Sequence, residues 1–318
     1  MKKPILFAAL LSASLLTALP LTACGGSDEL PPTFSPPSSQ ASSASSSGST
    51  SSFSDRAYYL VPSDYSSPEY AVSSDNTDDA EVVQEGNFLF FVYDDHVTVV
   101  GYDGTDYEVY IPDTVAGKPV TKIGESAFRP PLLCKRVHIP ETVEVIEHHA
   151  FADLSLEYVN FPARLKEIEE GAFSGGCSFE TLQLPESITV IRKNAFSDCG
   201  FKNIVLTQNI TAIENLAFSG CSSLEHIDIP SSVQHIGGFT FYGCTALRDV
   251  TIPDGIDSID DYTFYGCSSL SSVTLPDSVS SIHEAAFLGC SSLQEISIPG
   301  NCYYVSSSFS DNTTVIKR

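Results

Sequence analysis

The chain has 318 residues, which is enough for one or two domains. Its 40 acidic and 16 basic residues give a net charge of −24. This charge excludes binding to nucleic acid or to an anionic lipid surface by general electrostatic attraction. The negative charge favours solubility outside the cell. It is compatible with either basic partners or partners bridged by cations, and it does not distinguish the two.

The amino terminus is typical of a secretory signal. Lys2 and Lys3 precede an apolar run over residues 4–19, and small residues follow before Cys24. This run is short for a membrane span, which needs about 20 residues. A plain signal peptide cut near Ala23, or an uncleaved anchor, would share these features.

The end of the signal, LTACG at residues 21–25, resembles a bacterial lipobox. In lipoproteins with this motif the Cys thiol receives diacylglycerol, and cleavage leaves that Cys as the first mature residue. The resemblance implies a lipoprotein signal peptide at residues 1–23 and lipidation at Cys24. The lipid would anchor the mature chain to a membrane from outside.

A tether is predicted over residues 24–85. Residues 35–54 are mostly Ser, and residues 63–85 add Pro, Asp, Glu and Tyr. Without an apolar period, such a segment cannot bury enough surface to offset its conformational entropy, so we expect it to be disordered. It would act as a stalk that lifts the folded part from the membrane, or as a linker with no required length.

An internal repeat begins near residue 111 and continues towards the end of the chain. One Phe marks each unit, and successive marker residues lie 22 or 23 positions apart. In most units a Pro precedes the Phe by 11 positions. The markers are Phe128, Phe151, Phe173, Phe196, Phe218, Phe241, Phe264 and Phe287.

The unit LEHIDIPSSVQHI at residues 224–236 shows the pattern. Its spacing, L-x-x-I-x-I and then V-x-x-I, matches the opening of a leucine-rich repeat. The β-branched run predicts a short strand over residues 227–229, which Pro230 ends because Pro has no N–H to donate. A second extended piece over residues 233–236 leads to the turn that carries Phe241. We therefore predict a mainly β solenoid whose stacked coils share one core.

The repeat resembles that of the BspA-like leucine-rich-repeat surface proteins of bacteria, which has the form IPxSVxxIxxxAFxGCSSLxxVxIP. Residues 252–276, IPDGIDSIDDYTFYGCSSLSSVTLP, follow this form closely, whereas residues 116–120 are an insertion. The resemblance assigns residues 86–111 to a β lead-in, 112–300 to the repeats and 301–318 to a cap on the open end.

The lead-in is expected to contain three short strands of its own. The apolar and aromatic runs place them at residues 88–93, 96–102 and 107–111. Asp103-Gly104 predicts a hairpin turn between the second and the third strand.

Six Cys residues share one slot of the repeat, usually as GCSSL or GCTAL. Leu154 fills that slot in another unit, so a packing role is favoured over catalysis at six equivalent positions. Metal binding lacks CxxC spacing. Disulfides between coils would satisfy the Cα distance, but side chains pointing the same way favour a ladder of reduced thiols. The predicted ladder is Cys177, Cys199, Cys221, Cys244, Cys267 and Cys290.

The neighbours of the Cys in GCSSL have structural roles in this interpretation. Gly suits the tight turn that follows the Phe. The two Ser residues are expected to satisfy backbone groups of the turn.

Residues on either side of the central apolar position of each strand point away from the core and align as two columns. Solenoids use such surfaces for macromolecular recognition. Tyr and Arg are frequent in binding hot spots, so the best contact patch lies in the early coils; the alternative is a solvated polar face. The candidate residues are Arg136, His138, Tyr158, Asn160, Thr181, Gln183, His226 and Asp228.

Three functions compete. The family resemblance implies a lipid-anchored bacterial cell-surface protein that adheres to host matrix proteins or other cells, with an extracellular protein or surface ligand as partner and no nucleic acid or cofactor. The second is a structural envelope or stalk protein without a dedicated ligand. An enzyme would need a unique nucleophile beside a base in a pocket, and no signature such as GxSxG occurs. The first is preferred.

Overall fold

A computed structural model describes residues 80–130 and 132–318. The predicted signal peptide, the lipidation site Cys24 and the predicted tether up to residue 79 lie outside these residues. The described part is mainly β, and it is a solenoid of leucine-rich-repeat coils as predicted.

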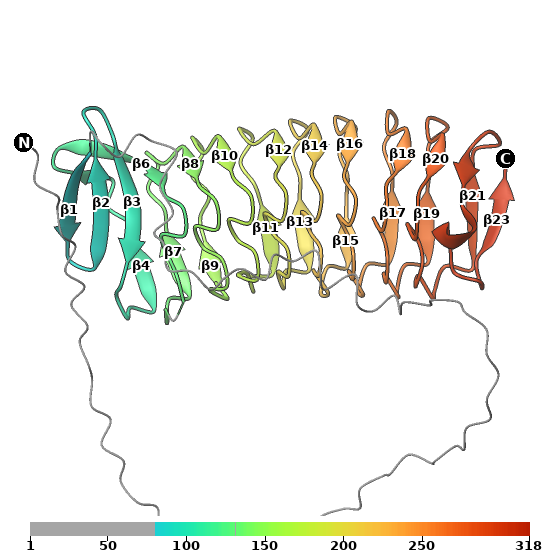
Figure 1. The fold of residues 1–318 in the computed structure, drawn as a ribbon, viewed down its shortest axis with the longest axis horizontal. Coiled ribbons are helices and arrows are strands. Elements are labelled where there is room, and N and C mark those ends of the chain that lie inside the picture. Colours follow the sequence, from blue (N-terminus) through green and yellow to red (C-terminus); the bar gives the residue numbers. More distant parts are fainter. Residues whose placement is uncertain (1–79, 131) are drawn as a thin grey trace, which may run out of the picture. The chain divides into compact units, whose positions relative to one another are not determined.

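Each coil contributes two short strands, and equivalent strands of successive coils lie side by side in two rows (Figure 1). The strand before the conserved Pro belongs to the first row, and the strand after it belongs to the second row. The first row contains β4 (Glu108–Tyr110), β7 (Arg136–His138), β9 (Tyr158–Val159), β11 (Thr181–Gln183), β13 (Asn203–Val205), β15 (His226–Ile227), β17 (Asp249–Thr251), β19 (Ser272–Thr274), β21 (Glu295–Ile298) and β23 (Thr314–Lys317).

The second row is parallel throughout, because each coil repeats the direction of the coil before it. Its central Ile residues are buried and face the first row across a continuous core. Its members are β3 (Val97–Tyr102), β6 (Lys118–Ile123), β8 (Val145–Ile146), β10 (Glu167–Ile168), β12 (Val190–Ile191), β14 (Ala212–Ile213), β16 (His235–Ile236), β18 (Ser258–Ile259), β20 (Ser281–Ile282) and β22 (Tyr303–Tyr304).

The lead-in starts earlier than predicted. Strand β1 (Glu81–Glu85) pairs antiparallel with β2 (Phe88–Val92), so the predicted tether was wrong at its last five residues. The residues of β1 are mostly exposed and include two Glu, so they show no apolar pattern that would predict a strand. The strand is instead stabilised by backbone pairing with the aromatic β2.

The predicted hairpin at Asp103-Gly104 was also wrong. Strand β3 pairs with β2 and β6, and β4 pairs with β7, so no hairpin joins β3 to β4. The hairpin turns of the lead-in lie instead at Gly86, where φ is +60°, between β1 and β2, and at residues 93–96 between β2 and β3. The chain crosses from the second row to the first between Tyr102 and Glu108, and this crossing is the start of the solenoid winding.

The insertion at residues 116–120 forms a small hairpin. Strand β5 (Thr114–Val115) pairs antiparallel with β6, and Ala116 and Gly117 at the turn have φ of +51° and +76°. Two successive residues of positive φ are the requirement of a tight two-residue hairpin. The insertion is therefore accommodated at the edge of one coil without interrupting the second row.

The marker Phe residues form a continuous stack through the core. Neighbouring ring centroids lie 4.8 to 6.1 Å apart, close to the spacing of adjacent strands. The stack continues beyond the predicted repeats to Phe309, whose ring lies 5.5 Å from that of Phe287. The predicted cap is thus a modified coil, and β23 pairs with β21 to complete it.

The turn around each Phe requires a left-handed backbone. The residue two positions before the Phe has φ between +51° and +64° in all eight coils, at Ser126, His149, Gly171, Asn194, Leu216, Phe239, Tyr262 and Ala285. Gly171 adopts this conformation without strain, whereas a residue with a side chain loses about 1–2 kcal/mol. Each turn is held by backbone bonds between coils, such as that from the Phe218 N–H to the Thr240 carbonyl.

The first row is interrupted between β9 and β11. The interruption coincides with an extra Gly before Cys177, which the Gly175-Gly176 pair supplies. Leu156 forms an isolated bridge with Cys177, and the ladder does not continue into β9. The break separates an amino-terminal sheet, β4-β7-β9, from a longer sheet, β11 to β19, and the last two strands of the row, β21 and β23, form a sheet of their own.

Candidate functional site

The amino-terminal sheet brings together side chains from three strands. Glu108 of β4 lies opposite Arg136 of β7, which lies opposite Tyr158 of β9, and Tyr110 lies opposite His138. Their side chains leave the sheet on the side away from the core because residues alternate along a strand. We call these five residues the strand-face cluster.

Glu108 organises the charges of the strand-face cluster. Its Oε1 accepts hydrogen bonds from Arg136 Nε at 3.1 Å and from His138 Nε2 at 2.8 Å. These bonds, that of His138 first, hold the pKa of Glu108 below its ordinary value, while the carboxylate raises the pKa of Arg136. Arg136 and His138 are therefore oriented by a common anion before any partner arrives.

Aromatic contacts complete the strand-face cluster. The Tyr110 ring stacks on His138 with centroids 4.1 Å apart and planes 2° apart, and the Arg136 guanidinium lies 4.6 Å from the centre of the Tyr158 ring. Tyr110 remains 64% exposed. Stacking restricts the rotamers of these large side chains, so a partner would meet a rigid surface with little entropy left to lose.

Asn160, predicted for the contact patch, has a structural role instead. Its Oδ1 accepts a hydrogen bond from the Ile139 N–H at 2.8 Å, and its Nδ2 donates to the Ile139 carbonyl at 2.7 Å. The side-chain amide thus replaces the backbone partner that Ile139 lacks in the neighbouring coil. The side-chain amide of Asn160, which the sequence predicted to contact a partner, is therefore already hydrogen-bonded within the fold.

Thr181 and Gln183 border the break between β9 and β11. Together with Tyr158 they line a shallow pocket of about 390 Å³, whose other walls include the part-buried rings of Phe161 and Phe179. The interruption of the sheet opens this pocket, because the strands on its two sides do not pair. It extends the strand-face cluster with a depression lined by both aromatic rings and polar side chains.

His226 and Asp228 lie apart from the strand-face cluster. His226 belongs to β15, two strands beyond β11 in the longer sheet, and its Nδ1 lies 3.2 Å from Asp249 Oδ2 of β17. Both His226 and Asp228 are exposed. They share the face with the cluster, as the column alignment predicted, but they do not belong to the same patch.

The repeat Cys residues are buried and their thiols are free. From the second ladder member onwards each Sγ donates to the carbonyl of a Phe in the preceding coil at 3.1 to 3.3 Å, as Cys244 does to Phe218. Burial raises the pKa of Cys221, Cys244 and Cys267 well above the ordinary value, which leaves them protonated and poorly nucleophilic.

The Gly and the first Ser of the GCSSL motif act as predicted. Gly220, Gly243, Gly266 and Gly289 all have left-handed φ, between +69° and +82°. The first Ser after the Cys donates to the equivalent carbonyl of the previous coil, as Ser291 does to Ser268 at 3.2 Å. The motif therefore bonds each turn to the turn beneath it.

Among residues 80–130 and 132–318, no cluster of three His, Cys, Asp or Glu side chains has the arrangement of a metal site. Nor does this part of the chain contain a helix with the length and apolarity of a membrane span.

A family model described as the BspA type leucine rich repeat region matches residues 107–225 and 211–317, with six copies. The chain belongs to this family. Members of the family are repeat scaffolds, which agrees with an open strand face and a core made of stacked Phe, Ile and Cys. No curated protein matches the chain significantly.

Several solved bacterial structures are similar to this BspA-type chain. A T. pallidum leucine rich repeat protein is 26% identical over 69% of this chain and 90% of its own, with a TM-score of 0.45. A leucine rich cell surface protein of Faecalibacterium prausnitzii is 21% identical over 74% and 94%, with a TM-score of 0.44. The pneumococcal vaccine antigen PcpA is 20% identical over 74% and 82%, with a TM-score of 0.49.

Sequence reasoning missed two residues of the strand-face cluster. Glu108 and Tyr110 lie in the lead-in, which was predicted to be separate from the BspA-type repeats. The two predicted columns of outward-facing residues therefore began at β7 instead of at β4. The signal was present, because Val109 and Ile111 have the spacing of a repeat strand and Pro112 follows them. Extending the columns by one coil would have placed Glu108 beside Arg136.

Proposed function

We propose that this BspA-type protein is a lipid-anchored adhesin of the bacterial cell surface that binds an extracellular protein through its first-row strand face. The observation that carries the proposal is the strand-face cluster, in which Glu108 holds Arg136 and His138 beside the exposed Tyr110 and the half-buried Tyr158. Arg and Tyr dominate hot spots of protein interfaces, and pre-ordered side chains lose little entropy on binding.

The surroundings of the cluster support a macromolecular partner rather than a small one. The face is open, and its pocket at the β9–β11 break is shallow and lined by both rings and polar side chains. An apolar side chain of a partner would fill this pocket while Arg136 and Tyr158 contact the adjoining surface. Such a combination of anchor and polar rim is the usual anatomy of a protein interface.

The binding proposal is tested with the full chain immobilised against a panel of purified host matrix proteins and intact bacterial cells. Arg136→Ala and Tyr158→Ala should each weaken capture about tenfold or more, the loss expected of a hot-spot residue. Arg248→Ala is the matched control, because Arg248 is an exposed arginine that also pairs with a glutamate, Glu225 at 2.9 Å.

The outcomes of this test are distinct. Equal losses in Arg136→Ala and Arg248→Ala, with no loss in Tyr158→Ala, would indicate general electrostatic attraction and contradict a role for the strand-face cluster. Capture of no panel member by the unaltered chain would favour a structural envelope or stalk protein. Loss restricted to Arg136→Ala and Tyr158→Ala would support the adhesin.

The lipid anchor has its own experiment. The support for it is the sequence LTACG at residues 21–25, after a charged and then apolar amino terminus. In bacteria fed a clickable fatty acid, the chain should be labelled and sediment with membranes, and Cys24→Ser should abolish both. Labelling that survives in Cys24→Ser would show that the anchor is wrong.

A further inference from the structure

Four aromatic side chains form a second cluster, in the turns of two later coils. Phe239 stacks on Tyr262 at 4.7 Å, and Tyr242 stacks on Tyr265 at 5.0 Å. The two stacks also touch, since Phe239 lies 6.0 Å from Tyr242 and Tyr262 lies 5.6 Å from Tyr265. All four rings are partly exposed. We call them the aromatic quartet.

The quartet is not required by the repeat. Phe239 and Tyr262 occupy the left-handed slot of their turns, with φ of +60° and +58°. The same slot holds residues as different as Gly171, Asn194 and Leu216 in other coils, so the repeat does not require an aromatic ring there. Bulky side chains in a strained backbone are a reason to look for function at that position.

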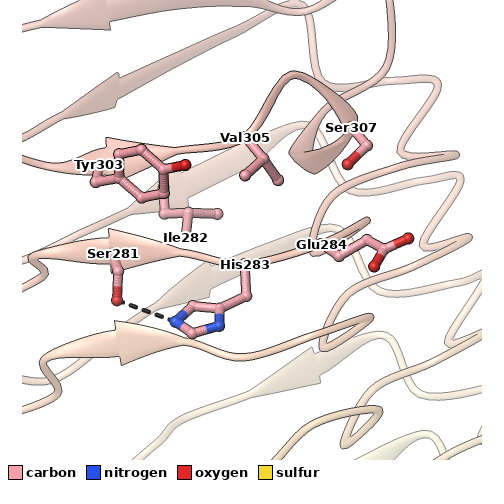
Figure 2. A pocket seen from close by; sticks show the side chains of 7 residues that line it. All are labelled: Ser281, Ile282, His283, Glu284, Tyr303, Val305 and Ser307. Atoms are coloured by element: carbon pink, nitrogen blue, oxygen red, sulfur yellow. Dashed lines mark hydrogen bonds between the residues drawn. The ribbon is translucent and has the colours of Figure 1, made fainter.

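A pocket of about 490 Å³ lies beside the quartet, between the last repeat coil and the cap. Figure 2 shows Tyr303 and Val305 of the cap coil on one side of this pocket and His283 and Glu284 on the other, with Ile282 between them. Glu284 links the two features, because the Tyr262 hydroxyl donates to its Oε1 at 3.5 Å. The quartet and the pocket therefore form one surface.

The walls of the pocket combine apolar and acidic groups. Tyr303 is 67% exposed, so its ring is available to a ligand, and Glu284 is exposed at the other side of the pocket. Long basic side chains suit such a site, because their apolar stems pack on rings while their charged ends reach a carboxylate. A cation beside an exposed Tyr ring gains further from the ring quadrupole.

The charge of the surrounding coils agrees with a basic ligand. Residues 211–300 contain 11 acidic residues and one basic residue, Arg248. Arg248 is paired with Glu225. These coils therefore present a negative field, which attracts cationic segments and repels acidic ones.

We propose that the aromatic quartet and the cap pocket together bind an extended, basic protein segment, with an Arg or Lys side chain in the pocket against Tyr303 and Glu284 and a neighbouring apolar side chain on the quartet. This surface is separate from the strand-face cluster and has a different partner chemistry. The carboxylate and rings select a cation, whereas the strand-face cluster presents a cation of its own, Arg136.

The test uses the full chain and a labelled synthetic peptide that carries Arg, Phe and Arg within a Gly-Ser frame. Fluorescence polarisation measures its binding at low and high salt. We expect saturable binding that weakens in high salt, and no binding of the matched peptide with Glu in place of Arg. Glu284→Gln and Tyr303→Ser should each weaken binding about tenfold, the effect of a hot-spot contact.

Two control variants separate this surface from general attraction and from the adhesin proposal. Glu295→Gln removes the same charge from an exposed residue of β21, and Tyr110→Ser removes an equally exposed tyrosine from the strand-face cluster. Both should bind the Arg peptide like the unaltered chain. Circular dichroism of every variant should match that of the unaltered chain, since all four side chains are exposed.

Three results would overturn the inference. The first is equal weakening by Glu284→Gln and Glu295→Gln, which would reveal attraction by net charge alone. The second is weakening by Tyr110→Ser but not by Tyr303→Ser, which would place the peptide on the strand face. The third is binding of a neutral oligosaccharide to the quartet with no binding of the Arg peptide.

Discussion

Asn160→Ala tests whether this residue stabilises the fold rather than serving recognition. The substitution removes both hydrogen bonds to Ile139, at 2.8 and 2.7 Å, and leaves its N–H and carbonyl without that partner. A typical intramolecular hydrogen bond contributes about 0.5–1.5 kcal/mol net, so the free energy of unfolding should fall by about 2 kcal/mol. The loss should appear in urea denaturation followed by far-UV circular dichroism.

Gln183→Ala is the matched control for this prediction. Gln183 occupies the same column in the next coil, is exposed, and has the same amide group. Its replacement should change the free energy of unfolding by less than about 0.5 kcal/mol, as expected for an exposed surface position. If Asn160→Ala were as stable as Gln183→Ala, the amide bridge would contribute nothing and the reasoning would be refuted.

Two further predictions concern the turns and the thiols. Ala285→Gly should raise the free energy of unfolding by about 1 kcal/mol, because Gly adopts the φ of +53° found there without strain. Ala286→Gly, in the core beside it, should lower the free energy of unfolding by a similar amount. Equal effects of the two substitutions in urea denaturation would contradict the proposed strain at the left-handed position. Folding raises the pKa of the Cys221, Cys244 and Cys267 thiols, so the folded chain keeps protons that the unfolded chain loses near pH 8.5. The contribution of these thiols to the free energy of unfolding should therefore be complete below that pH and fall as the pH rises above it, and the fall should be less steep in Cys244→Ala. Iodoacetamide should modify these thiols only after denaturation. Modification of the native chain, detected by mass spectrometry, would contradict their burial.

Part of the strand-face cluster could be predicted from the alignment of outward-facing residues in columns. Arg136, His138 and Tyr158 could be placed on one surface from the sequence, because residues that flank the central position of a strand share a side and coils stack in register. Their partner Glu108 was left out because the lead-in was treated as separate from the repeats, although Val109, Ile111 and Pro112 continue the repeat spacing. The hydrogen bonds that orient Arg136 and His138 depend on the pairing of β4 with β7, which the structure shows.

The pocket at the β9–β11 break could not be predicted in the same way. The extra Gly before Cys177 was visible in the sequence as a departure from the period. Whether such a residue bulges out of a turn or shifts strand pairing depends on the neighbouring coils, which here form a bridge between Leu156 and Cys177 instead of extending β9. The pocket on the surface therefore follows from the interrupted strand pairing, which the sequence does not specify.

The repeat architecture was determined by the sequence itself. Each slot packs on the same slot one coil away, so a period of 22 or 23 residues specifies the Phe stack, the Cys ladder and the Gly turns without further knowledge. Tertiary structure alone decided the surface chemistry: that Asn160 bonds to Ile139, that Glu108 orients Arg136, and that Tyr262 of the aromatic quartet reaches Glu284. These contacts depend on the reach of individual side chains between coils, which a one-dimensional period does not contain.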